Sequence, residues 1–437
     1  MTPGAQIQAS IELLEDVHDA WEEGRAAPVD SMLGTYFRNR RYIGAKDKGF
    51  ISRRVYAVLR HGGQLQWYLE KAKLHISPRT LVLATLVMDE KHPINILQTW
   101  FTGNEHDARP LHKEERAFIE NPPACDTDAM PEWMRLNTPE WCLPRLRKVF
   151  GENLEAELEA LNQEAPLDMR VNTLKTTREE AAKALGKENF YVTPTPYSPW
   201  GLRLDRRGAL FATKTFRDGW IEVQDEGSQL VALLGNPQPG DKVIDFCAGA
   251  GGKTLALAAM MKNKGRLLAW DTSETRLAQS AKRFARAGVD NVQRHVLTSE
   301  TDSFIKRHKD SADLVVIDAP CSGSGTWRRN PDLKWRFSES DLAEIVAIQR
   351  NILDSAQRLV KKGGKLLYIT CSVFEDENES QLKQFLTKHP DFMVADTHEI
   401  WNKHTRPESA GDDSRLLRLS PYLTGTDGFF AALLQKD

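Results

Sequence analysis

Long apolar runs are missing from the 437-residue chain. A transmembrane helix needs about 20 apolar residues, and the stretch from Leu81 to Met88 is the longest near the middle of the first half. The N-terminus also lacks the basic segment and apolar core of a secretory signal. We therefore expect no membrane partner and a cytoplasmic location, while 41% hydrophobic and 27% charged residues are typical of a globular chain.

Cysteine is scarce as well, because the chain has only five: Cys125, Cys142, Cys247, Cys321 and Cys371. An odd, sparse set argues against a disulfide framework and favours a reducing compartment. The sequence contains no Cys-x-x-Cys pair and no His-Glu-x-x-His helix, so we expect no metal site.

Charge of one sign is not in excess, because 59 Lys and Arg residues stand against 61 Asp and Glu residues and give a net charge of -2. This balance excludes a wholly basic nucleic-acid coat protein but leaves room for a local basic face. Heptad repeats are absent too, and we expect a monomer. The length itself predicts two or three domains.

The residue pattern divides the chain into three predicted domains. Residues 1–137 carry apolar positions at three- and four-residue spacing, which predicts helices such as one over 7–21. Residues 138–220 predict a helix over 144–162, followed by short strands in a small α+β module. Residues 221–437 alternate strands with helices.

Strands of the last domain are predicted by short apolar runs, and helices are predicted over 274–287 and 342–360. Buried strands that alternate with crossover helices imply an α/β, Rossmann-like fold with a doubly wound, mainly parallel sheet. Such sheets bind ligands at the carboxyl ends of their strands. The four clearest runs are residues 242–246, 266–270, 313–318 and 365–370.

A glycine-rich loop follows the first of these strands and leads into a helix. Glycines let the backbone approach a ligand closely, and the start of the helix offers free N–H groups. Asp271 closes the second strand, 20 residues after Gly251, where an acidic side chain can bind a ribose hydroxyl pair. The residues predicted to bind a cofactor are Cys247, Ala248, Gly249, Ala250, Gly251, Gly252, Lys253, Asp271 and Asp318.

Three ligand classes compete for this loop. A Walker loop requires the frame GxxxxGK[ST], and residues 247–254 lack its first glycine, so that interpretation fails. A dinucleotide site stays open, although the glycine spacing is not GxGxxG. S-adenosylmethionine carries no phosphate and needs only the glycine turn and the acidic residue, so we favour it; a plain strand-to-helix turn is the alternative without function.

Two cysteines follow strand ends on the ligand side of the predicted sheet. Cys321 comes after the strand that ends at Asp318, and Cys371 comes directly after the strand that ends at Thr370. A single cysteine in such a place is most simply a small packing residue. Two of them, one beside an Asp-Ala-Pro turn, favour chemistry.

Five short segments carry recognisable motifs: residues 224–229 (Gln-Asp-Glu-Gly-Ser-Gln), 247–254, 318–323 (Asp-Ala-Pro-Cys-Ser-Gly), 370–372 (Thr-Cys-Ser) and 425–430 (Gly-Thr-Asp-Gly-Phe-Phe). Together they resemble the RsmB/NOP2/Sun family of RNA 5-methylcytosine methyltransferases, and most closely its bacterial RsmB branch. The combination of the two cysteine motifs is highly specific for this family. The resemblance implies a Rossmann-like domain that uses S-adenosylmethionine.

The resemblance also implies a role for each polar residue of the site. Carbon 5 of cytosine is a poor nucleophile, so a thiolate must first add to carbon 6, and Cys371 resembles that nucleophile. Asp318 resembles the residue that binds the Watson–Crick edge, and Cys321 the one that helps to release the product. Lys253 is expected to orient the base or to favour the thiolate; a solvated lysine at a helix start is the plain alternative.

The chain departs from the family pattern at two places. Family members usually read Cys-Ala-Ala-Pro-Gly-Gly-Lys-Thr in the loop, whereas Gly249 and Ala250 occupy the middle here. Losing the proline frees one φ angle, and we expect cofactor binding to persist. The third-strand segment, residues 292–300, lacks the aspartate often found near the adenine, so no adenine contact is assigned.

Two basic segments are candidates for RNA contacts. Eight basic residues and one acid between Arg38 and Arg60 give 8 − 1 = +7, a phosphate-binding pattern whose alternative is a solvated helix face. Residues 327–336 combine arginines with two tryptophans, which suits a flipped base and its flanking phosphates. The predicted RNA-binding residues are Arg38, Arg40, Arg41, Arg328, Arg329, Lys334 and Arg336.

The helical N-terminal segment resembles the NusB-like domain of bacterial RsmB, and the middle module resembles the small RNA-recognition-like subdomain of the family. We therefore expect an enzyme that methylates carbon 5 of a cytosine in RNA, with ribosomal RNA as the first choice and transfer RNA as the near alternative. Two rivals stay open. A non-catalytic RNA-binding ribosome assembly factor is disfavoured by the intact site residues, and a methyltransferase for proteins or small molecules leaves the cysteine pair unexplained.

Overall fold

The structure is a computed structural model that describes residues 1–24, 27–407 and 413–437. Within them the chain forms two compact units. The first consists of Met1–Gln163 and Trp327–Ser338, and the second of Glu164–Thr326 and Glu339–Asp437. The chain therefore leaves the second unit once, contributes a short segment to the first, and returns.

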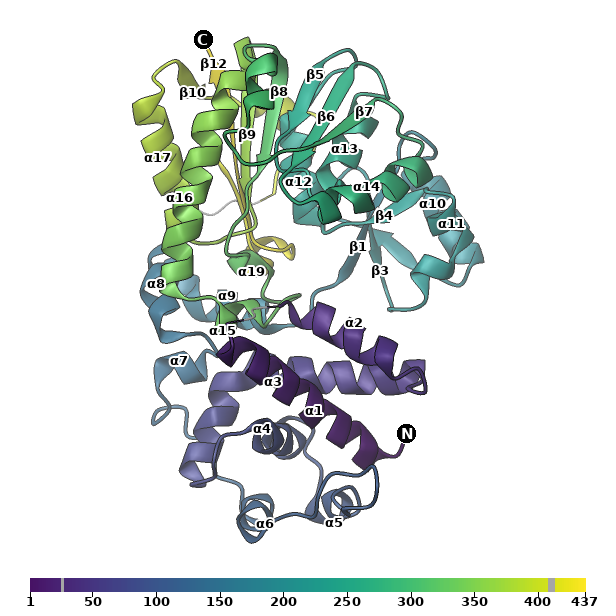
Figure 1. Cartoon of the computed structure of the whole chain (residues 1–437), viewed down its shortest axis with the longest axis vertical. Helices are drawn as coiled ribbons and strands as arrows, with labels where there is room; N and C mark the ends of the chain where they lie inside the picture. Colours follow the sequence, from purple (N-terminus) through teal and green to yellow (C-terminus); the bar gives the residue numbers. More distant parts are fainter. Residues whose placement is uncertain (25–26, 408–412) are drawn as a thin grey trace. The chain divides into compact units, whose positions relative to one another are not determined.

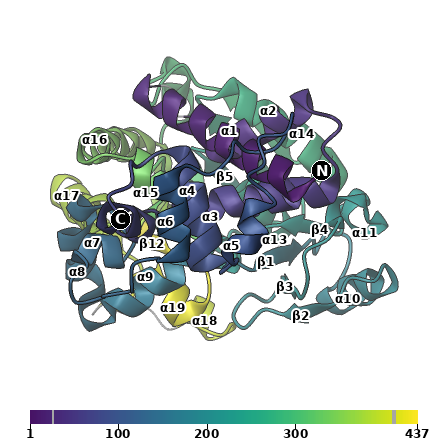
Figure 2. The ribbon, with the colours of Figure 1, turned by 90° about the horizontal axis from the view of Figure 1, so that it is seen from below.

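The first unit is built from helices (Figures 1 and 2). Its longest helix, α3 (Ala45–Lys71), packs against α1 (Pro3–Glu22) and α4 (Pro78–Ala84), and the three bury a shared apolar core. The hydroxyls of Thr2 and Ser77 cap α1 and α4 by accepting first-turn N–H groups. The other helices are α2 (Val29–Asn39), η1 (Thr85–Asp89), α5 (Ile94–Gln98), α6 (Lys113–Glu120), α7 (Glu132–Arg135), η2 (Glu140–Cys142), α8 (Leu143–Phe150), η3 (Gly151–Asn153), α9 (Leu154–Asn162) and α15 (Leu333–Arg336).

The segment Trp327–Ser338, called the strap below, is part of the first unit although it comes from the middle of the second unit in sequence. The amine of Lys334 is buried and donates to the carbonyl of Arg60 at 2.9 Å. Nε1 of Trp335 donates to the carbonyl of Leu59 at 2.5 Å. The strap thus bonds to two consecutive carbonyl groups of α3.

The second unit contains a small antiparallel sheet with the strand order β2-β3-β1-β4. Met169 in β1 lies opposite Leu202 on one side and Val223 on the other. Met169 and Leu202 are buried, and they share a core with residues of α10 and α11. The elements are β1 (Leu167–Val171), α10 (Arg178–Lys187), β2 (Val192–Pro194), β3 (Gly201–Leu204), η4 (Leu210–Ala212), α11 (Lys214–Arg217) and β4 (Ile221–Val223).

The large sheet of the second unit has the order β10-β12-β9-β8-β5-β6-β7, and β11 pairs with β12. The strands from β9 to β7 run parallel. β12 pairs antiparallel with β9, and β10 and β11 each pair antiparallel with β12. The predicted Rossmann-like sheet is confirmed. Its strands are β5 (Lys242–Asp245), β6 (Arg266–Asp271), β7 (Val292–Val296), β8 (Ala312–Asp318), β9 (Val360–Thr370), β10 (Phe392–Val394), β11 (Leu417–Leu419) and β12 (Phe429–Lys436).

Helices cover both faces of the large sheet: α16 and α17 lie on one face and α12, α13 and α14 on the other (Figure 1). Alternation along β8 explains this layering, because Val315 and Ile317 join the core under α16, while Leu314 and Val316 join the core under α12 and α13. The remaining elements are α12 (Glu226–Gly235), α13 (Gly252–Met260), α14 (Glu274–Ala287), η5 (Ser303–His308), η6 (Ser324–Thr326), α16 (Glu339–Ala356), η7 (Gln357–Leu359), η8 (Glu375–Glu377), α17 (Glu379–Lys388), α18 (His398–Trp401) and α19 (Pro421–Thr424).

Two predicted helices are shorter than expected. The helix over 144–162 is interrupted because Gly151 has φ +53, outside the helical region, so α8 ends before it and α9 begins after it. The helix over 342–360 ends as α16 at Ala356, since β9 begins at Val360. The division into three domains stays a prediction.

Candidate active site

The glycine loop between β5 and α13 turns on two glycines in the left-handed region, Gly249 at φ +52 and Gly251 at φ +81. A Cβ at Gly251 would stand 2.5 Å from the ring of Phe284, so no side chain fits there. A Cβ at Gly249 would meet no atom within 4 Å. One glycine is therefore required by packing, and the other borders open space that a ligand can fill.

Asp271 lies directly against this loop. Its buried carboxylate accepts a hydrogen bond from the N–H of Gly249 at 2.8 Å through Oδ2 and one from the N–H of Ser273 at 2.7 Å through Oδ1. Arg276 also donates to Oδ1, at 3.2 Å. The structure thus brings together the acidic residue and the loop that the sequence analysis singled out.

Two arginines hold the loop by its carbonyl groups. Arg283 donates to the carbonyl of Ala250 at 2.7 Å, and Arg170 in β1 donates to that of Gly252 at 2.9 Å. Burial lowers the pKa of Arg170 to about 10. Sequence reasoning missed both residues; the available signal was an arginine at a buried position of the predicted strand in the small module.

Asp245 ends β5 and is buried beneath the loop. The Thr254 hydroxyl donates to its Oδ2 at 2.7 Å, whereas its Oδ1 has no partner among the described residues. Burial raises the pKa of Asp245 to about 7. The carboxyl group is therefore partly protonated at neutral pH.

Lys253 and Asp318 form an ion pair, with 2.7 Å between Nζ and Oδ2. The lysine side chain is 9% exposed and that of Asp318 is 34% exposed. The ammonium also lies 5.4 Å from the ring centroid of Phe429. Lys253 is therefore not a solvated lysine at a helix start, and the pair presents one partly exposed carboxylate.

The sulfur atoms of Cys321 and Cys371 lie 3.2 Å apart. Their proximity follows from the sheet, because β8 and β9 are parallel neighbours and each cysteine follows the carboxyl end of one of them. The hydrogen bond with Cys371, together with burial, raises the pKa of the Cys321 thiol. Cys321 is thus held as a neutral thiol beside a second sulfur.

The motif at 425–430 packs against the backbone of this site. The N–H of Gly428 donates to the carbonyl of Gly325 at 2.8 Å, and the N–H of Gly325 donates to the carbonyl of Cys371 at 3.0 Å. A Cβ at Gly325 would collide with the carbonyl of Gly428. Glycine at both positions therefore permits a backbone contact that fixes the residue after β9.

The motif at 224–229 supports neighbouring segments through hydrogen bonds. Oδ1 of Asp225 accepts the N–H groups of Gly227 at 2.8 Å and Asp427 at 3.1 Å. The buried Glu226 accepts those of Tyr197 and Ser198, each at 2.7 Å. These bonds tie α12 to the 425–430 motif and to the small sheet.

The family model described as 16S rRNA methyltransferase RsmB/F matches residues 232–435, and the RsmF/B-like ferredoxin-like domain matches residues 138–210. A probable ribosomal RNA small subunit methyltransferase B from Synechocystis is 34% identical over 332 residues, which cover 75% of this chain and 73% of the relative. The chain belongs to the RsmB/F methyltransferase family.

Other comparisons agree. A ribosomal RNA small subunit methyltransferase B from Sodalis glossinidius is 29% identical over 90% of this chain and 91% of its own. Among solved structures, PH0851 matches 100% of this chain and 99% of its own with a TM-score of 0.79 and 26% identity. A methyltransferase homolog from Pyrococcus horikoshii matches 70% of this chain and 97% of its own, with a TM-score of 0.61 and 29% identity. The predictions of an RNA methyltransferase and of its cofactor, S-adenosylmethionine, are confirmed.

The site of this RsmB/F methyltransferase fits that cofactor. The open space at Gly249 can receive it, and Asp271 is fixed beside the loop by the Gly249 N–H. When bound, S-adenosylmethionine supplies the methyl group. The contacts of single residues from Cys247 to Lys253, and of Asp318, stay predictions.

The predicted RNA-binding residues of the first unit differ in exposure. Arg38 and Arg41 are exposed and line an open hollow of about 440 Å³ together with Lys48. Arg40 instead lies 3.7 Å from the ring centroid of Tyr36 and 3.5 Å from the Glu12 carboxylate. Arg38 and Arg41 are therefore the better placed of the three to contact phosphates.

The predicted RNA-binding residues of the strap are less accessible. Lys334 and Arg328 are buried, and Arg336 pairs with Asp332 at 2.9 Å. The burial of Lys334 has a structural cause, since its amine bonds to α3. Direct phosphate contacts by Lys334 and Arg328 would require these side chains to leave their places, and for Arg329 and Arg336 the expectation stays a prediction.

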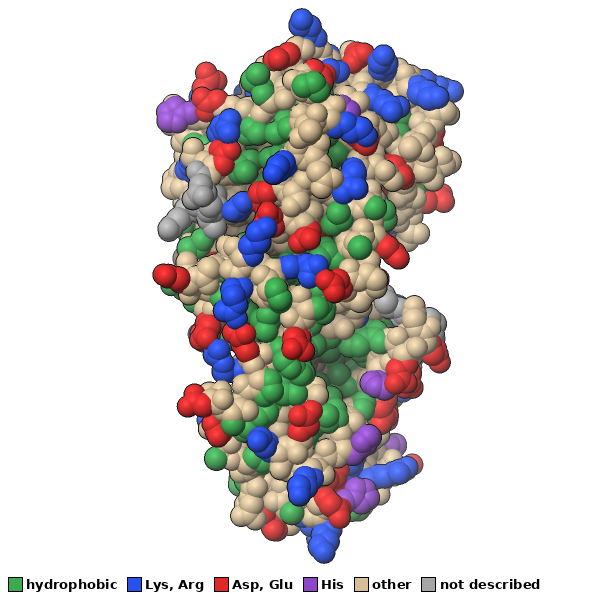
Figure 3. Space-filling view, turned by 90° about the vertical axis from the view of Figure 1, so that its left-hand side faces the viewer, with side chains coloured by type: hydrophobic (Ala, Val, Ile, Leu, Met, Phe, Trp, Pro, Cys, Tyr) green, Lys and Arg blue, Asp and Glu red, His purple; other side chains and the backbone are tan. Residues whose placement is uncertain are grey.

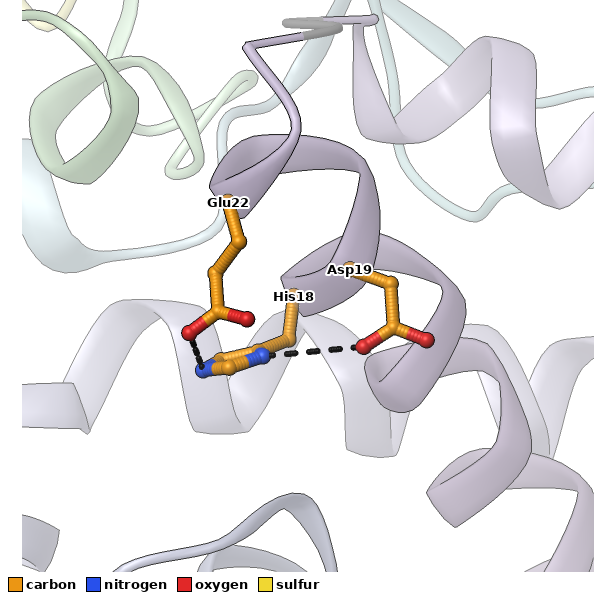
Figure 4. Close-up of side chains that lie close together, drawn as sticks. All are labelled: His18, Asp19 and Glu22. Carbon is orange, nitrogen blue, oxygen red and sulfur yellow. Dashed lines mark ion pairs between the residues drawn. The ribbon is translucent and has the colours of Figure 1, made fainter.

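Metal ligands were not expected, and one cluster of suitable side chains is present in the described residues: His18, Asp19 and Glu22 on α1 (Figure 4). All three are exposed, and the histidine nitrogens lie 3.8 Å from Asp19 and 3.6 Å from Glu22. Such contacts are ordinary ion pairs of a helix surface.

Charges on the face shown in Figure 3 are interspersed, with acidic and basic side chains side by side. The described helices include none that is both long and apolar enough to span a membrane.

Proposed function

We propose that this enzyme methylates carbon 5 of a cytosine in RNA of the small ribosomal subunit through a covalent adduct with Cys371. The observation that carries the proposal is the cysteine pair, with its sulfurs 3.2 Å apart at the carboxyl ends of β8 and β9. A methyltransferase that acts on a nitrogen or oxygen atom needs no nucleophilic thiol, and this site holds two sulfurs that follow neighbouring strand ends.

The reaction begins when the Cys371 thiolate forms a bond to carbon 6 of the base, which pushes electron density toward carbon 5. Asp318 accepts hydrogen bonds from the Watson–Crick edge and so holds the base in the site. Carbon 5 then takes the methyl group that bound S-adenosylmethionine would supply, with S-adenosylhomocysteine as the leaving group, and the carbon-5 proton passes to water. The electron pair of that C–H bond restores the ring double bond as the bond between carbon 6 and sulfur breaks, which regenerates the thiolate.

Cys321 has the role of releasing the product. Its raised pKa keeps its proton on sulfur in the resting site, 3.2 Å from Cys371. Lys253 keeps the Asp318 carboxylate in place through the 2.7 Å ion pair. The burial of the ammonium strengthens this pairing relative to a surface pair.

Ribosomal RNA is the favoured substrate because relatives from Synechocystis and Sodalis glossinidius are described as ribosomal RNA small subunit methyltransferases. Transfer RNA is the alternative. Arg38 at the end of α2 and Arg41 in the turn after it are exposed and supply phosphate contacts at the hollow they share with Lys48. An RNA substrate and reduced cysteines suit a cytoplasmic location.

The test uses small-subunit RNA and transfer RNA transcribed with cytidine that carries tritium at carbon 5, together with unlabelled S-adenosylmethionine. Methylation at carbon 5 expels the tritium into water, so we expect one tritium released for each methyl group that enters small-subunit RNA. Methyl transfer without tritium release would place the reaction at another atom. Tritium release from transfer RNA alone would identify transfer RNA, and not small-subunit RNA, as the substrate.

A further inference from the structure

We propose that Glu377 is a positioning residue that holds the loops of Cys321 and Cys371 together and so keeps the two sulfurs within reach of one base. This inference rests on the proposed function, in which both sulfurs act on the same cytosine and must therefore lie close together. Glu377 lies in η8 between β9 and α17, within an acidic stretch that the sequence analysis did not single out.

The Glu377 carboxylate is fully buried and accepts hydrogen bonds at both oxygens. Oε1 accepts from the N–H of Ser322 at 2.8 Å and from Nε2 of Gln349 at 3.0 Å. Oε2 accepts from the hydroxyl of Ser322 at 2.5 Å and from that of Ser372. Ser322 follows Cys321 and Ser372 follows Cys371, so one side chain is bonded to the neighbours of both cysteines.

The serines bonded to Glu377 extend the connection. Oγ of Ser324 lies 3.0 Å from Oγ of Ser372 and accepts the N–H of Val373 at 2.9 Å. Gln349, which donates to Glu377, also donates to the carbonyl of Pro320 at 2.9 Å. Hydrogen bonds therefore reach the backbone on both sides of Cys321 and on the far side of Cys371, with the carboxylate at their centre.

Charge gives Glu377 a second effect on the pair. Burial raises the pKa of Glu377, while the hydrogen bonds from Ser322 and Ser372 favour its charged form. Its negative charge adds to the causes that raise the pKa of the Cys321 thiol, after the Cys371 hydrogen bond and burial. The residue that fixes the loop thus also favours the neutral thiol.

A purely structural carboxylate would support folding without setting the distance between the sulfurs, so the test measures that distance by chemistry. Phenylarsine oxide joins two nearby thiols: two As–S bonds form, and the oxide oxygen leaves as water with both thiol protons. Its affinity is measured for the full-length wild type, Glu377→Ala and Glu377→Gln. Cys371→Ala, which has no pair, gives the background.

Glu379→Ala is the matched control. Glu379 lies two residues away and is also largely shielded, but it pairs with Arg418 and not with the cysteine loops. We expect Glu377→Ala to bind the arsenical at least about tenfold more weakly and to lose kcat by a similar factor, with KM for S-adenosylmethionine unchanged, because small misplacements of reacting groups are costly. Glu379→Ala should behave as wild type in all three.

Glu377→Gln keeps the volume and one carbonyl oxygen, so it answers the question if the alanine variant fails to fold. We expect it to fall between wild type and Glu377→Ala in arsenical affinity. Wild-type affinity in the folded Glu377 variants would overturn the proposal, whatever their activity. Failure of the cytosine chemistry would show in the tritium assay and leave the arsenical result as expected, so the two failures are distinguishable.

Discussion

Gly249 and Gly251 lie two residues apart in one loop and meet different surroundings. Both have φ in the left-handed region, where an alanine costs roughly 1–2 kcal/mol. Only at Gly251 would a Cβ also meet the ring of Phe284, at 2.5 Å. At the scale of single residues, this contrast separates folding of the loop from binding of the cofactor.

We expect Gly251→Ala to lower the thermal unfolding midpoint more than Gly249→Ala does, because its Cβ overlaps a buried ring. Gly249→Ala should bind S-adenosylmethionine more weakly, since the Cβ at position 249 enters the open space beside the loop. Differential scanning fluorimetry and isothermal titration calorimetry measure the two effects. Wild-type affinity in Gly249→Ala would mean that the cofactor does not lie against Gly249.

The raised pKa of Asp245 leads to a prediction of how the stability of the protein depends on pH. Its pKa is about 7 in the folded protein and about 4 in the unfolded chain, so between these values the folded state holds a proton that unfolding releases. The free energy of unfolding of the wild type therefore falls as pH rises from about 4 to about 7, by up to about 1.4 kcal/mol per pH unit for this group. Above pH 7 the titration of Asp245 changes the stability no further.

Asp245→Asn lacks this titration. We expect its unfolding midpoint, relative to wild type, to rise between about pH 5 and about pH 7 and then to level off. Thermal unfolding of both proteins in a buffer series measures the difference. A constant difference across the series would show that Asp245 has an ordinary pKa in the folded state.

At the scale of elements, the end of α2 and the turn after it present Arg38 and Arg41 at a hollow beside the start of α3. Replacing Arg38 and Arg41 together by alanine should raise KM for RNA by on the order of tenfold and reduce the salt slope of RNA binding by about 2. KM for S-adenosylmethionine should not change. Arg147→Ala, an exposed arginine of α8 paired with Glu132, is the control. Equal effects of both replacements would contradict a specific contact at Arg38 and Arg41.

Helices and strands were predictable from the sequence where the local pattern of apolar residues determines them. Three parallel strands were predicted to within one residue at one end because short apolar runs between helices are typical of buried strands: β5, β6 and β8 against 242–246, 266–270 and 313–318. The strand predicted over 365–370 is longer, since β9 begins at Val360. The antiparallel strands β10 and β11 were not predicted, because they depend on pairing with β12 from a distant part of the chain.

The candidate site was predictable to a different extent. Asp318, Cys321 and Cys371 could be found because Asp318 ends a strand and each cysteine follows a strand end, and the parallel sheet brings such positions to one edge. Glu377 could not be found, because an acidic run after a strand reads as a solvated helix start. Arg170 was missed for a similar reason, since only the tertiary contact with Gly252 shows its use.

At the scale of the whole molecule, the place of the strap in the first unit is the clearest feature that the sequence did not predict. RNA binding by the strap stays a prediction; what the structure adds is that Lys334 and Trp335 supply hydrogen bonds to α3 within the first unit. The first unit is therefore incomplete without a segment encoded more than 160 residues after Gln163.

We expect a fragment of residues 1–163 to unfold at a lower temperature than the same fragment mixed with a peptide of residues 327–338. A peptide with Trp335→Ala should stabilise it less, because it loses the bond to Leu59 and the packing against Gly62. Fluorimetry with increasing peptide gives the midpoints. An unchanged midpoint with the wild-type peptide would show that the strap is not needed by the first unit.

The most direct test of the account compares wild type, Cys371→Ala and Cys321→Ala with radiolabelled S-adenosylmethionine and RNA that lacks the modification. The products are separated on a denaturing gel. We predict that Cys371→Ala transfers no methyl group and that Cys321→Ala accumulates labelled RNA attached to protein, because the adduct forms and is not released. Methylation of RNA by Cys371→Ala would contradict the mechanism and leave the cysteine pair as packing residues.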